Sequence, residues 1–141
     1  MTGEPTRGER DNDPGNLRRD ATPWLGLVPL ADCVEQVFCT FDTPVHGIRA
    51  LCKVLLSYQR LDGCRTLAQV IDRYAPKTEN DTDAYLADVV ARAGVGAGEV
   101  LDLARPAELT NIVRAIIFHE NGRCIYDATV VSKAVSLALA D

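Results

Sequence analysis

The chain has 141 residues, of which 47% are hydrophobic and 25% are charged, with 15 Lys and Arg against 20 Asp and Glu. Such a composition is typical of a globular protein with one core, and a net charge of −5 without a basic run argues against duplex nucleic acid as the main partner. No apolar run reaches the roughly 18 residues that span a bilayer. The N-terminus also lacks the apolar core of a secretory signal, so we expect a protein made in the cytoplasm without a signal peptide.

The residue types that most often bind metals give no metal-site pattern in this chain. The five cysteines are dispersed without a CxxC pair, and His46 and His119 lie outside any metal-ligand spacing. We therefore predict no zinc site and mostly reduced thiols, with one incidental disulfide left open. The stretch from Gly94 to Gly98 lacks the GxGxxG order of a dinucleotide site, so no cofactor is predicted.

The first 20 residues are polar and interrupted by glycine and proline, which predicts irregular structure. Within them lies a dense patch, RGERDNDPGNLR, from Arg7 to Arg18. Its Pro-Gly-Asn sequence favours a tight turn in which Asn and Asp side chains bond the backbone. Two interpretations stay open: a plain surface loop, or a rigid loop that presents amide and guanidinium groups to a polar ligand.

The stretch from Ala21 to Phe41 has the pattern of a short β region. Its two apolar or alternating runs, Trp24 to Val28 and Val34 to Phe41, are separated by Pro29. We predict a two- or three-stranded hairpin that packs on a helix. Trp24, the single tryptophan, is equally compatible with a core position and with a ligand-binding position.

Five capped segments with apolar stripes predict helices in the rest of the chain. The predicted helices run from Pro44 to Arg60, from Thr66 to just before Pro76, from Asn80 or Asp81 to Gly94, from Pro106 to Gly122, and from Ala128 to Ala140. The expected fold class is therefore α+β, mainly helical with a small β-hairpin. Residues 1–20 form the polar segment and residues 21–141 a single domain.

Glu120 stands out on the helix that Pro106 opens. It follows Ile112 and Ile116 at spacings of eight and four residues, so its side chain shares their apolar face. Desolvation there and the negative end of the helix dipole are both expected to raise the pKa of Glu120, as a general acid requires. The alternative is that Glu120 lies at the edge of the stripe and extends into water.

Several motifs together resemble a family of small phage and prophage proteins described as virion structural proteins or as peptidoglycan hydrolases. The motifs are RGERDNDPGNLR (Arg7 to Arg18), TPWLG (Thr22 to Gly26), FDTPVHGIRAL (Phe41 to Leu51), RYAPKTENDTDAYL (Arg73 to Leu86) and RAIIFHENG (Arg114 to Gly122). The chain departs from the family pattern at Asp13, where asparagine is usual. It also has RCIYD from Arg123 to Asp127, where a Pro-Tyr-Ser-Asp pattern is more typical.

A more distant resemblance suggests a chemistry. The turn from Asn12 to Arg18, the predicted hairpin and FDTPVHGIRAL resemble the middle of glucosaminidases and lytic transglycosylases of the lysozyme superfamily. In those enzymes a helix ending in Glu-Ser-Gly precedes the hairpin, whereas here Glu120-Asn121-Gly122 follows it. A circularly permuted lysozyme-like domain would account for this order. It requires the turn to approach the C-terminal end of the Glu120 helix.

These resemblances imply a peptidoglycan-degrading glycosidase of muramidase, glucosaminidase or lytic transglycosylase type, with Glu120 as general acid. The implied cleft residues, which would bind the sugar chain, are Asn16, Arg18, Trp24, Asn80 and Tyr85. The implied partners are peptidoglycan and other virion proteins, with the product made in the host cytoplasm and then virion-associated or delivered to the cell wall.

Several alternatives stay open. Glu9 is a rival acid, and Asp42 is a candidate second carboxylate whose better role is helix capping. Without a second carboxylate, the substrate N-acetyl group could assist, or an anhydro-sugar could form. The protein could also be a non-catalytic virion structural or peptidoglycan-binding protein, or an intracellular protein-binding module.

Overall fold

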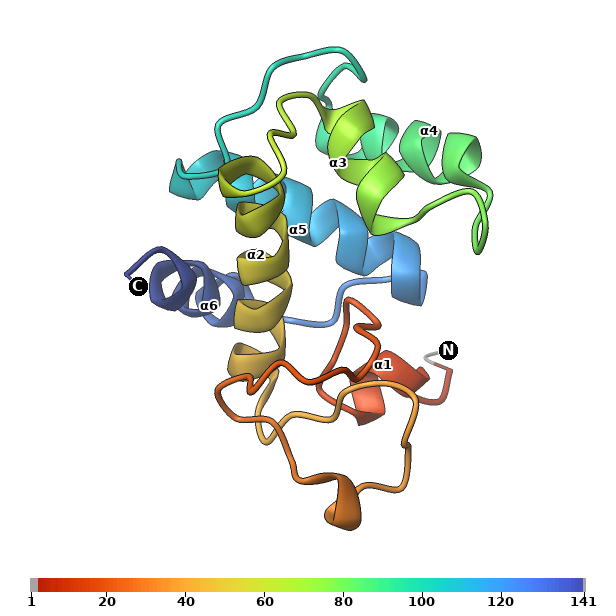
Figure 1. The fold of residues 1–141 in the computed structure, drawn as a ribbon, viewed down its shortest axis with the longest axis vertical. Coiled ribbons are helices and arrows are strands. Elements are labelled where there is room, and N and C mark those ends of the chain that lie inside the picture. Colours follow the sequence, from red (N-terminus) through yellow and green to blue (C-terminus); the bar gives the residue numbers. More distant parts are fainter. Residues whose placement is uncertain (1–2, 141) are drawn as a thin grey trace.

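The structure, a computed structural model, describes residues 3–140, and the elements found there are helical (Figure 1). The elements are α1 (Arg7–Arg10), a 3₁₀ turn (Leu30–Asp32), α2 (Pro44–Arg60), α3 (Leu67–Tyr74), α4 (Thr82–Ala93), α5 (Pro106–Asn121) and α6 (Ala128–Ala140). No helix within this range is long and apolar enough to cross a membrane.

The main core forms where α2, α5 and α6 pack together. α2 packs along α6, while α5 contacts both α4 and α6. Leu51 and Leu55 of α2 and Ile112 and Ile116 of α5 are almost fully buried in this core. Burial of each such side chain contributes about 1.5–3 kcal/mol, so these apolar stripes hold the five long helices together.

The five predicted helices are confirmed, and so are most of their end signals. The Thr43 side chain accepts a hydrogen bond from the backbone of His46 at the start of α2, and Thr66 forms a capping box with Gln69 at the start of α3. Asp81, one of the two predicted caps, begins α4. Glycines 94 and 122 end α4 and α5 in the left-handed conformation, with φ of 68° and 74°.

The predicted α+β class and its hairpin are wrong, because the described residues contain no β-strand or sheet. Between residues 17 and 41 there are two isolated antiparallel bridges, Arg18 with Phe38 and Leu27 with Phe41. The chain from 37 to 42 therefore pairs first with one segment and then with another, and neither pairing extends into a ladder. Pro29 follows the second bridge closely and has no N–H to continue it.

Residues 3–20 are more ordered than the polar composition predicted. Thr6 caps the short helix α1 in a capping box with Glu9, which the sequence pattern had not suggested. The segment then lies across the start of α2, where a side chain at Gly47 would overlap the carbonyl oxygen of Asn12. Glycine at position 47 therefore lets the N-terminal backbone pack directly on α2.

Candidate active site

The N-terminal turn lies against the C-terminal end of α5. The amide of Asn16 donates a 2.6 Å hydrogen bond to Oε1 of Glu120. Next to it, the amide of Asn121 donates to the carbonyl oxygens of Pro14 and Ile117, at 2.8 and 2.9 Å. The expected approach of the turn to the end of the Glu120 helix is therefore confirmed, although the predicted hairpin is absent.

The second oxygen of Glu120 is also held in place. The Tyr85 hydroxyl donates a 2.7 Å hydrogen bond to Oε2 of Glu120. Burial, reinforced by the Glu120 carboxylate, raises the pKa of Tyr85, so its hydroxyl keeps the proton that it donates. The Tyr85 ring is 2% exposed and packs 3.8 Å from the His119 ring, measured between centroids. Glu120 thus has one rigid donor on each carboxylate oxygen.

Glu120 is half-buried and lines a cleft of about 350 Å³. The cleft lies between the N-terminal turn, the second half of α2 and the segment after α3. Its lining residues are Arg7, Gly15, Asn16, Leu17, Arg18, Phe38, Val54, Tyr58, Tyr74, Ala75, Glu79, Asn80 and Glu120. The cleft therefore combines amides, guanidinium groups, carboxylates and aromatic rings. Proteins use such groups to bind the hydroxyl groups and rings of carbohydrates.

The structure brings most of the predicted site residues together. Asn16, Arg18 and Asn80 line the cleft with Glu120, and Tyr85 lies beneath the Glu120 carboxylate. Trp24 is half-buried and packs instead against a small cluster formed by Leu17, Cys39, Phe41 and Ala50. It is not among the residues that line the cleft.

Sequence reasoning missed five polar or aromatic residues of the cleft: Arg7, Phe38, Tyr58, Tyr74 and Glu79. Phe38 belongs to the stretch from Val34 to Phe41, whose alternating apolar residues predict a strand. That pattern does not indicate that the Phe38 ring faces a cleft. Glu79 belongs to the polar connection after α3 and forms a 3.7 Å ion pair with Arg18. Only the density of arginines around residues 7–18 could have indicated that Arg7 was involved.

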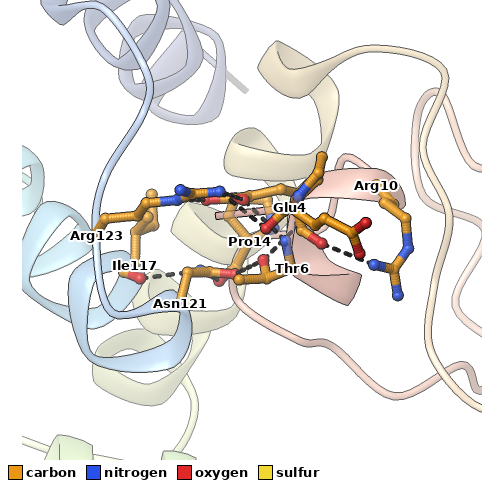
Figure 2. Close-up of polar contacts among 9 residues, drawn as sticks. Glu4, Thr6, Arg10, Pro14, Ile117, Asn121 and Arg123 are labelled. Carbon is orange, nitrogen blue, oxygen red and sulfur yellow. Dashed lines mark hydrogen bonds and ion pairs between the residues drawn. The ribbon is translucent and has the colours of Figure 1, made fainter. Parts of the chain in front are cut away.

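An ion pair between the buried Glu9 and the partly exposed Arg123 fixes the N-terminal segment to the residues that follow α5. Arg123 donates two hydrogen bonds to the carboxylate of Glu9, at 2.6 and 2.9 Å. Figure 2 shows Arg123 and Asn121 reaching the N-terminal residues. The Thr6 hydroxyl donates a hydrogen bond of 2.6 Å to the Asn121 side chain. The Arg123 hydrogen bonds lower the pKa of Glu9, so this rival acid is held ionised and its oxygens are already occupied.

Asp13, at the start of the turn, is a buried carboxyl group. It is 1% exposed and accepts a 3.1 Å bond from the Leu17 backbone through Oδ1, while Oδ2 has no hydrogen-bond partner. Burial raises the pKa of Asp13 to about 8. Near neutral pH the side chain is therefore mostly protonated, and in that form it has the shape and charge of asparagine.

The candidate second carboxylate, Asp42, does not line the cleft. Its Oδ1 lies 2.6 Å from Nδ1 of His46, and this contact lowers the pKa of Asp42. Thr43 makes the capping bond at the start of α2. The carboxylates that do line the cleft are Glu79 and Glu120. Across residues 3–140, no cluster of three His, Cys, Asp or Glu side chains could hold a metal ion.

Comparison with known proteins identifies a phage relative. The chain is 34% identical over 134 residues to protein P5 of Pseudoalteromonas phage PM2, and the match covers 92% of this chain and 80% of that protein. The chain belongs to the P5 family of phage proteins. This P5-family membership confirms the predicted relation to phage proteins. No family model matches the chain.

Proposed function

We propose that this P5-family protein binds the glycan strands of peptidoglycan in the cleft and cleaves a glycosidic bond with Glu120 as the proton donor. The observation that carries the proposal is the position of Glu120. Its carboxyl group lies at the wall of a polar, aromatic cleft, fixed by Asn16 on one oxygen and by Tyr85 on the other. A fixed carboxyl group in a sugar-sized cleft is the central component of a glycosidase.

In the proposed reaction, the carboxyl group of Glu120 gives a proton to the glycosidic oxygen as the bond to the anomeric carbon breaks. The leaving sugar departs as an alcohol, and Glu120 becomes a carboxylate. The donors on Asn16 and Tyr85 then stabilise the new negative charge without having to move. A water molecule then bonds to the anomeric carbon and gives its proton to Glu79, the other cleft carboxylate. In the transglycosylase route a hydroxyl of the substrate bonds to that carbon instead and returns its proton to Glu120, which leaves an anhydro-sugar.

The experiment is to incubate the purified protein with peptidoglycan sacculi and to analyse the soluble products by mass spectrometry. Cleavage should release disaccharide muropeptides. Products with a free reducing end indicate hydrolysis, and 1,6-anhydro-sugars indicate the transglycosylase route without added water. Sacculi that stay intact with a folded protein would contradict the catalytic proposal.

Membership of a phage protein family favours a second candidate, a virion-associated protein that binds peptidoglycan without cleaving it. The two donors on Glu120 support it equally, because they would also fix a carboxylate that only accepts hydrogen bonds from sugar hydroxyls. In that case the protein should sediment with sacculi and release no product. It should also be found in purified phage particles by peptide mass spectrometry.

A further inference from the structure

A second hollow, of about 360 Å³, lies between α4, α5 and the segment that follows α5, and it shares no lining residue with the cleft that contains Glu120. α4 packs along α5 here (Figure 1). Since a helix turns by about 100° per residue, the Phe118 and Glu120 side chains point to nearly opposite sides of α5. The hollow is therefore a separate site. Its lining residues are Arg92, Asn111, Arg114, Ala115, Phe118 and Cys124.

The two arginines of this hollow lie on either side of one aromatic ring. The Cζ atom of Arg92 on α4 is 3.8 Å from the centroid of the Phe118 ring. Arg114 precedes Phe118 by four residues on α5, a spacing that makes two side chains neighbours on a helix surface. One small anion in the hollow can therefore reach both guanidinium groups, and its negative charge would offset the repulsion between them.

Both arginines have donors to spare. Within residues 3–140, the half-buried Arg114 side chain has no hydrogen bond or ion pair. Arg92 donates a 2.9 Å bond from Nε to Oδ2 of Asp88, which leaves its two Nη nitrogens for a ligand. The same Asp88 oxygen lies 2.7 Å from Nδ1 of His119, so Asp88 is shared and offsets Arg92 only in part. None of the described residues that line the hollow is acidic, although the whole chain carries a net charge of −5.

We propose that this hollow binds a phosphoryl group between the guanidinium groups of Arg92 and Arg114. Guanidinium donors match phosphate oxygens, and a tetrahedral phosphoryl group presents oxygens in several directions, as two arginines on different helices require. A planar carboxylate pairs with one guanidinium group and leaves the second poorly matched. A soluble phosphate ester and a lipid headgroup both present such oxygens. The site is independent of the proposed cleavage reaction.

Cys124 gives the test a direct readout, because it lines the hollow. Cys124 and Cys33 are both half-buried free thiols, Cys33 lies outside the hollow, and the other three cysteines are buried. The protein is treated with iodoacetamide at increasing concentrations of inorganic phosphate and constant ionic strength. Peptide mass spectrometry then follows alkylation of each thiol. Acetate is the matched carboxylate, and sedimentation with phosphatidylglycerol vesicles tests the lipid source.

We expect phosphate to slow the alkylation of Cys124 and to leave that of Cys33 unchanged. Arg92→Gln and Arg114→Gln should each weaken phosphate binding, read from this protection, by about tenfold, the usual size of one charge-assisted contact. Arg65→Gln, an exposed change outside the hollow, is the control and should not alter the protection. If Arg92→Gln fails to fold, Arg114→Gln decides, because it removes no hydrogen bond or ion pair within the described residues.

Vesicle binding that Arg114→Gln abolishes would assign the phosphoryl group to a lipid headgroup. Protection by phosphate without vesicle binding would assign it to a soluble phosphate ester. The inference is overturned if phosphate does not change the alkylation rate of Cys124, if acetate protects Cys124 equally well, or if protection survives in folded Arg114→Gln protein.

Discussion

Asn16 and Glu120 lie 104 positions apart in the chain, and a 2.6 Å hydrogen bond joins their side chains. Asn16 belongs to the N-terminal turn and has a left-handed backbone, with φ of 53°. Asparagine tolerates this conformation better than most residues. The turn therefore has two roles. It places an amide against the proposed proton donor, and it forms one wall of the cleft.

The other donor to Glu120 gives the first prediction. Tyr85→Phe keeps the buried ring but removes the hydroxyl that fixes Oε2 of Glu120. Peptidoglycan cleavage should fall by roughly tenfold or more, and the free energy of unfolding by about 1 kcal/mol. Both are measured on one preparation, by release of muropeptides and by urea unfolding. Tyr126→Phe is the control, since the Tyr126 hydroxyl is buried without a partner. Equal activity in the two variants would show that Tyr85 has no role in catalysis.

The second prediction concerns the pH dependence of stability. The pKa of Asp13 is raised from 3.8 to about 8, so between these values the folded protein binds more protons than the unfolded chain. The contribution of Asp13 to the free energy of unfolding is complete at low pH. It is lost as the pH rises, by roughly 1 kcal/mol per pH unit between about pH 4 and 8. Asp13→Asn should remove that loss.

Urea unfolding of both proteins at pH 5, 6.5 and 8 measures the effect. The stability of Asp13→Asn relative to the wild type should increase steadily with pH, and the variant should be the more stable protein at pH 8. Asp32→Asn, which alters an exposed carboxylate, should follow the wild-type profile. Parallel profiles for the wild type and Asp13→Asn would mean that Asp13 is not protonated in the folded protein.

The third prediction concerns the ion pair between Glu9 and Arg123. Arg123→Ala leaves the buried Glu9 carboxylate without its cation, so the melting temperature at pH 7 should fall by several degrees. The pKa of Glu9 is lowered below its usual 4.5, so the pair stabilises the fold above that value and is lost as the pH falls through the folded pKa. The difference between variant and wild type should therefore shrink in acid. Arg65→Ala, at an exposed position, is the control. An equal fall in melting temperature in that variant would show that the loss does not come from the ion pair between Glu9 and Arg123.

The helices were predictable because their signals are local. Thr66 with Gln69, and the glycines at 94 and 122, act within a few residues of the helix end that they define. The prediction of a hairpin was wrong because a strand forms only with a partner strand elsewhere in the chain. Phe38 alternates as a strand residue should, but its bridge is to Arg18 and its ring faces two arginines instead of a sheet.

The site was predictable only in part, and for a similar reason. The apolar stripe of α5 singled out Glu120, but the stripe carries no information about what lies opposite it. The approach of the turn that contains Asn16 was expected from the resemblance to sugar-cleaving enzymes and not from spacing, whereas its hydrogen bond to Glu120 was not predicted. No local rule connects Tyr85 on α4 or Arg7 on α1 with a residue at the end of α5, because these positions meet only through the packing of α4 and α1 on α5.

Replacement of Glu120 by glutamine tests the proposed proton donor most directly. Glutamine keeps the shape of the side chain and can still accept one hydrogen bond, but it cannot donate a proton to a glycosidic oxygen. We expect release of muropeptides from sacculi, measured by mass spectrometry, to fall about a hundredfold or more, with the melting temperature nearly unchanged. Glu99→Gln, an exposed change outside the cleft, should keep full activity. Undiminished release by a folded Glu120→Gln protein would contradict the assignment of Glu120 as the proton donor.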